Sequence, residues 1–126
     1  MKFAVLGTNE MTLDMAEIIQ DSNHEVVCLV SLDKENLPNN SSDIKRFSKE
    51  KNINYFETEN LNSKVSIKFL KDLNADFFIS TWPKIISREV LNIPKYSVIG
   101  THPTELPKNK GRHPLHWMIV LKLKNS

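Results

Sequence analysis

The chain has 126 residues, 40% of them hydrophobic and 25% charged, which is ordinary for one soluble globular domain. Its 17 basic and 15 acidic residues give a net charge of +2, and its single cysteine, Cys28, argues against a disulfide framework or a zinc cluster. The first residues turn polar too soon for a signal peptide, and no apolar stretch is long enough to span a membrane. We therefore expect a cytoplasmic protein with no membrane partner.

The first third of the chain predicts two strands that flank a helix. The apolar run Lys2–Leu6 ends at Gly7, which allows a tight turn into a helix capped by Thr8 or Asn9. Glu25–Leu32 is apolar on both faces, as a strand in a covered parallel sheet must be. Apolar residues at helical spacing between these strands are Met11, Met15, Ile18 and Ile19.

The middle of the chain continues the alternation of helices and strands. A polar loop over residues 36–42 leads to Ser42, the expected cap of a second helix. Ile53–Phe56 predicts a third strand, Ser63 is expected to cap a third helix, and Asp76–Ser80 predicts a fourth strand. The apolar residues of these two helices are Ile44 and Phe47, then Val65, Phe69, Leu70 and Leu73.

The last third adds one more strand between two helices. Ser87–Asn92 predicts a short helix that ends before Pro94, and Ser97–Thr101 predicts a fifth strand. Pro114 suits the first turn of a last helix. The strict alternation predicts a single α/β domain over residues 1–126, with a doubly wound, mostly parallel sheet. The apolar residues of the last helix are Leu115, Trp117, Met118, Ile119 and Leu121.

The carboxyl ends of the predicted strands indicate where a ligand binds, because doubly wound sheets bind ligands beyond these ends. The segments concerned are residues 7–9, 81–83 and 100–102, which makes His102 a candidate site residue. The three glycines, at positions 7, 100 and 111, form neither a dinucleotide fingerprint nor a P-loop. This disfavours nicotinamide or flavin binding and nucleotide hydrolysis.

Charge is distributed unevenly along the chain. Residues 1–94 carry 11 basic and 14 acidic residues, a net −3, whereas residues 95–126 carry six basic and one acidic residue, a net +5. A basic segment attracts an anionic ligand. The segment lacks the interleaved aromatic residues of a single-strand nucleic-acid platform, so we expect no nucleic-acid partner.

Residues 98–117 form a proline-framed loop between a strand and a helix, and this loop resembles the active-site signature of formyltransferases that use 10-formyltetrahydrofolate. The positions that match this family in identity or type are His102, Pro103, Thr104, Leu106, Pro107, Gly111 and Pro114. Upstream, the loop that contacts the folate in the family resembles Trp82, Pro83, Lys84, Ile85 and Ile86. The resemblance implies a Rossmann-like formyltransferase fold with 10-formyltetrahydrofolate as co-substrate.

The resemblance also implies a catalytic role for His102, which would stabilise a tetrahedral oxyanion or relay the proton of the attacking amine. Basic residues of the loop are candidates for the phosphates of a nucleotide-linked acceptor. No metal is expected, because His113 and His116 lack a third ligand. The substrate-binding candidates are Thr8, Thr104, Lys108, Lys110 and Arg112.

Three departures from the family pattern leave the activity open. The family's catalytic Asn aligns with Gly100, its Arg aligns with Lys110, and its catalytic Asp would lie beyond Ser126. We therefore expect a fold that is incomplete at the C-terminus, with an unpaired strand edge that favours self-association or a complementing chain. The sequence favours formyl transfer to a small-molecule amine such as a nucleotide-linked amino sugar, or a truncated and inactive relative. The alternative is a non-catalytic folate- or partner-binding module.

Overall fold

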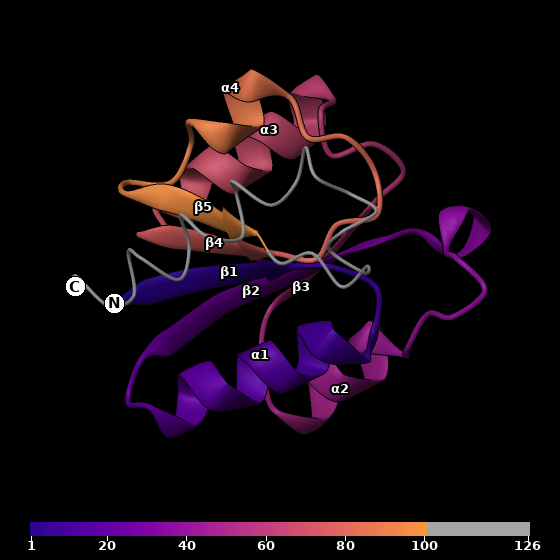
Figure 1. The fold of residues 1–126 in the computed structure, drawn as a ribbon, viewed down its shortest axis with the longest axis vertical. Coiled ribbons are helices and arrows are strands. Elements are labelled where there is room, and N and C mark those ends of the chain that lie inside the picture. The colour runs from indigo at the N-terminus through magenta and orange to yellow at the C-terminus, as the bar shows by residue number, and fades with distance from the viewer. Residues whose placement is uncertain (101–126) are drawn as a thin grey trace, which may run out of the picture.

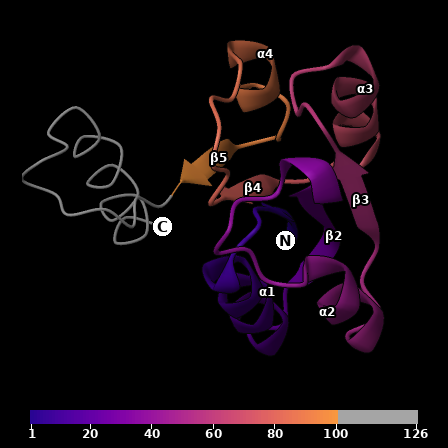
Figure 2. The same cartoon turned by 90° about the vertical axis from the view of Figure 1, so that its right-hand side faces the viewer.

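The computed structural model describes residues 1–100, which form an α/β fold around a five-stranded, all-parallel sheet of order β3-β2-β1-β4-β5. Helices α1 and α2 cover one face and α3 and α4 the other (Figure 1), and Figure 2 views the sheet end-on. This confirms the predicted doubly wound parallel sheet. The strands are β1 (Lys2–Leu6), β2 (Glu25–Leu32), β3 (Tyr55–Thr58), β4 (Phe77–Ser80) and β5 (Ser97–Gly100). The helices are α1 (Glu10–Asp21), the 3-10 turn η1 (Lys34–Asn36), α2 (Ile44–Glu50), α3 (Lys64–Asp72) and α4 (Arg88–Leu91).

The two faces of the sheet supply two hydrophobic cores. In β1, Ala4 and Leu6 belong to the core under α3 and α4, and Val5 belongs to the core under α1 and α2. The alternation follows from the two-residue period of a strand. Strand β2 carries one extra residue, Val27, because Phe3 pairs with Val26 but Ala4 pairs with Cys28.

A side chain caps the start of each crossover helix, and an asparagine follows shortly after its end. Asn9 caps α1 in a capping box with Thr12, and Ser63 caps α3 as predicted. The cap of α2 is Asp43, so the prediction of Ser42 was wrong by one residue. Three asparagines just beyond the ends of α1, α2 and α3 adopt the left-handed conformation, with φ of 63°, 56° and 52°. They are Asn23, Asn52 and Asn74.

Several predicted boundaries need correction. Strand β3 spans Tyr55–Thr58 rather than Ile53–Phe56, and β4 begins one residue later than predicted. Ile18 and Val65, two of the apolar residues that indicated helices α1 and α3, are 60% and 73% exposed. The last predicted helix, from Pro114, lies outside the described residues.

Candidate functional site

The candidate site lies at the carboxyl ends of β1 and β4, where the strand order reverses. Residues 7–9 leave β1 there, and residues 81–83 leave β4 beside them. Ser80 pairs with Gly100, so β5 ends at the same edge of the sheet. The fold therefore brings together the described parts of all three segments that the strand ends predicted.

Gly7 directly follows β1 at this edge of the sheet. Its amide donates to the carbonyl of Val30 at 2.9 Å. A Cβ atom here would overlap the hydroxyl oxygens of both Thr12 and Thr81, which lie 2.8 Å apart in a hydrogen bond. No described glycine has a positive φ, so position 7 requires glycine because of close packing and not because of its backbone conformation.

Thr8, the next residue, is buried, with 3% of its surface exposed. Its carbonyl accepts a hydrogen bond from the backbone amide of Ser42 at 2.8 Å, which ties the loop before α2 to the end of β1. This predicted substrate-binding residue thus lies at the carboxyl edge of the sheet, and its contact with substrate stays a prediction.

The loop of residues 82–87, here called the β4–α4 loop, contains all five predicted folate-contacting residues. Trp82 and Ile86 are partly buried and pack against the core under α3 and α4. The residues between them, Pro83, Lys84 and Ile85, are exposed, and the side chain of Ile85 is 89% exposed. The loop is therefore anchored at both ends and exposes its middle residues, whose contact with folate stays a prediction.

Asn62, which the sequence did not single out, connects to this loop. Its Nδ2 donates to the carbonyl of Ile85 at 3.1 Å, and its Oδ1 accepts from the amide of Ser87 at 2.8 Å. No periodicity marks Asn62, which precedes the cap Ser63 and looks like an ordinary loop residue.

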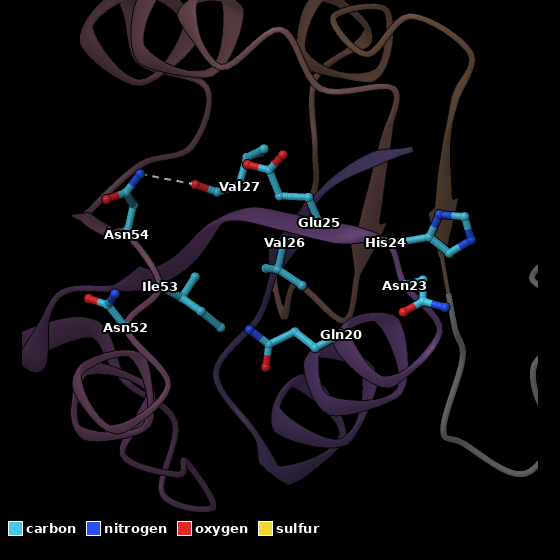
Figure 3. Close-up of a pocket in the computed structure, with 9 residues that line it drawn as sticks. All are labelled: Gln20, Asn23, His24, Glu25, Val26, Val27, Asn52, Ile53 and Asn54. Carbon is cyan, nitrogen blue, oxygen red and sulfur yellow. Dashed lines mark hydrogen bonds between the residues drawn. The ribbon is translucent and has the colours of Figure 1, made fainter.

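A depression of about 510 Å³ lies at the opposite, amino edge of the sheet, near the ends of α1 and α2 (Figure 3). Side-chain amides of Gln20, Asn23 and Asn52 line it, and Asn54 donates to the carbonyl of Val27 at 3.3 Å. Parallel sheets bind ligands at the other edge, so this depression is not the candidate site.

A second depression, of about 540 Å³, adjoins the loop that Ser42 ties to β1. Lys34 and Lys45 line it together with hydroxyl groups, including that of Tyr55. Burial raises the pKa of Tyr55, and the hydrogen bond that its hydroxyl donates to Glu57 at 2.9 Å raises it further. Tyr55 therefore stays neutral and acts here as a hydrogen-bonding group.

Residues 1–100 contain neither a reactive cysteine thiol nor a cluster of metal ligands. Burial raises the pKa of the Cys28 thiol to about 12, which leaves it protonated and unreactive. Residues 1–100 contain no group of three or more acidic, His or Cys side chains placed to hold a metal ion. Their helices are also all too short or too polar to cross a bilayer.

Most of the predicted acceptor-binding residues, and the predicted catalytic histidine, fall outside the described part of the chain. Their assigned roles stay predictions. These residues are His102, Thr104, Lys108, Lys110 and Arg112.

Comparisons with known proteins match this chain to one family. A family model described as formyl transferase matches residues 1–121. A methionyl-tRNA formyltransferase of Prochlorococcus marinus subsp. pastoris is 31% identical over 126 residues, covering 95% of this chain and 38% of that protein. The methionyl-tRNA formyltransferase of Mycoplasma genitalium is 33% identical over 132 residues, covering 99% of this chain and 42% of that protein. The chain thus spans about two fifths of the length of these relatives.

Proposed function

Because the chain belongs to the formyl transferase family, we propose that it binds 10-formyltetrahydrofolate at the carboxyl edge of its sheet and takes part in formyl transfer to an amine. The observation that carries this proposal is the meeting of three segments there: the Gly7 turn, the β4–α4 loop and the end of β5. The sequence continues from Gly100 to His102 two positions later. The exposed middle of the β4–α4 loop supports its role as the folate contact.

The proposed reaction begins when the amine nitrogen attacks the formyl carbon, which forms a C–N bond and a tetrahedral oxyanion. The bond from that carbon to the folate nitrogen then breaks, and tetrahydrofolate leaves with the proton that the amine has lost. His102 is proposed to donate to the oxyanion or to relay this proton. Gly100 replaces the family's Asn donor, and loss of one oxyanion donor typically lowers kcat by about 10²–10³.

The first candidate acceptor is the α-amino group of methionyl-tRNA. The relatives named above are methionyl-tRNA formyltransferases, which supports a nucleic-acid acceptor and is in tension with the expectation of none. The basic residues 95–126, with a net charge of +5, suit an anionic acceptor. The second candidate is a nucleotide-linked amino sugar. It is favoured by the sequence of residues 111–114, Gly-Arg-His-Pro, which resembles the sugar-modifying branch of the family.

Two measurements on the purified chain test the proposal. Calorimetry with the stable folate 5-formyltetrahydrofolate measures donor binding, and mass spectrometry measures formylation of methionyl-tRNA and of a uridine-diphosphate amino sugar in parallel. Formylated methionyl-tRNA is the expected product. Formylation of the sugar alone would support the second acceptor, and folate binding without transfer to either would support a non-catalytic folate-binding module. Failure to bind the folate would refute the proposal.

A further inference from the structure

We propose that Asn62 is a positioning residue that holds the β4–α4 loop in the shape that receives the folate. The inference rests on the proposed function, because it takes this loop to be the folate contact. Its geometric basis is the pair of hydrogen bonds from one side-chain amide to the backbone of Ile85 and Ser87.

The side-chain amide of Asn62 bonds to the loop backbone in the way that the backbone of a neighbouring strand would. It donates to the carbonyl of Ile85 and accepts from the amide of Ser87, so both bonds flank Ile86. This fixes Ile86 toward the core while Ile85 remains 89% exposed. Ser87 also caps α4, because its hydroxyl accepts from the amide of Val90 at 3.3 Å. Asn62 therefore sets which loop residues face a ligand.

Asn62 is itself held in place from the end of β3. Its backbone amide donates to Oδ1 of Asn60 at 2.9 Å, and the amide of Asn60 donates to the hydroxyl of Thr58 at 3.2 Å. The next residue before it, Leu61, is 1% exposed and anchors this turn in the core. Side chains that position a binding loop need such rigid support.

The two bonds have no substitute within residues 1–100. No other described side chain from outside the loop bonds to the backbone of residues 83–87. Without Asn62, the exposed stretch between Trp82 and Ser87 would lose its link to α3 and sample more conformations. A folate would then have to order the loop on binding, at a cost in affinity.

The test compares Asn62→Ala with Asn62→Asp and with a matched control, Asn54→Ala. Asn54 also donates a side-chain amide to a backbone carbonyl, that of Val27 at 3.3 Å, but at the opposite edge of the sheet. Calorimetry with 5-formyltetrahydrofolate, well below the melting temperature of each variant, gives the dissociation constant of the folded protein. We expect Asn62→Ala to weaken binding about tenfold and Asn54→Ala to change it less than about twofold.

Amide hydrogen exchange at Ser87 supplies the second readout. Asn62→Asp keeps an acceptor for this amide and loses the donor to Ile85, so exchange should stay slow and the loss of affinity should be intermediate. Asn62→Ala should make exchange fast. A purely structural role would lower the melting temperature and leave the dissociation constant of the folded protein unchanged.

The possible failures are distinguishable. A wild-type chain that binds folate no more tightly than Asn62→Ala does would overturn the positioning role and leave the proposed function standing. A wild-type chain that binds no folate would instead refute the proposed function, and with it any folate role for this loop.

Discussion

Replacement of Gly7 by alanine should destabilise the fold by about 2 kcal/mol, within a range of about 0.5–4 kcal/mol. The new methyl group would come closer than 3.0 Å to the hydroxyl oxygens of Thr12 and Thr81. Forcing an extra methyl group into a packed interior costs about 1–3 kcal/mol, and separating two hydrogen-bonded hydroxyls adds about 0.5–1.5 kcal/mol. Reduced entropy of the unfolded chain offsets about 0.4–1 kcal/mol of this.

Urea unfolding followed by circular dichroism measures this cost, provided that the dependence on urea concentration is the same for both proteins. The decisive control places Gly7→Ala in a background with Thr12→Ala and Thr81→Ala, which removes both oxygens. There the substitution should cost less than about 1 kcal/mol, so the coupling should exceed about 1 kcal/mol. An undiminished cost in this background would show that the two hydroxyls are not the reason for glycine.

Three further predictions concern other parts of the chain. Asn74 has a φ of 52°, so Asn74→Gly should leave the free energy of unfolding nearly unchanged. Asn74→Ala should lower that free energy by about 1 kcal/mol, and urea titration measures both values. Burial raises the pKa of the Cys28 thiol from 9.0 to about 12, so this thiol ionises at lower pH in the unfolded chain than in the folded one. The free energy of unfolding should therefore fall between pH 9 and pH 12, by up to about 1.4 kcal/mol per pH unit. In Cys28→Ala this dependence on pH should be weaker. His102→Ala should slow formyl transfer by about 10²–10⁴ in initial-rate assays and keep folate affinity within about twofold; an equal loss of affinity would contradict its catalytic role.

Much of the fold is predictable because buried parallel strands read as continuous apolar runs. Glu25–Leu32 is such a run, and its limits were predicted correctly. The edge strand β3 was misplaced because Ile53 is buried before the strand begins, while the polar Glu57 and Thr58 still pair with β2. An edge strand has one unpaired side open to solvent, so its pairing leaves a weaker hydrophobic signal.

Helices α1 and α3 also bury polar side chains. Thr12 and Ser66 are fully buried, whereas the apolar Ile18 and Val65 are exposed. The hydroxyl of Ser66 is satisfied by Thr58 at 2.7 Å. Such partners are distant in sequence, so periodicity alone does not reveal them.

The candidate site was predictable to the level of strand ends and no further. The alternation of strands and helices placed residues 7–9 and 81–83 at one edge of the sheet, which the structure confirms. The role of Asn62 was not predictable, because its contacts join positions 23 and 25 residues apart through one side chain. The clash that requires Gly7 likewise depends on Thr81, a residue brought close only by the pairing of β1 with β4.

The central position of β1 in the sheet has a consequence for folding during synthesis on the ribosome. Phe3 pairs with Val26 on one side but with Phe77 on the other, so this second partner is synthesised 74 residues after Phe3 itself. At about 5–20 residues per second, one flank of β1 stays open for about 4–15 s of synthesis. During that interval the emerging polypeptide displays a ready template for β-pairing, and nascent chains halted before Phe77 should be those that chaperones hold most firmly.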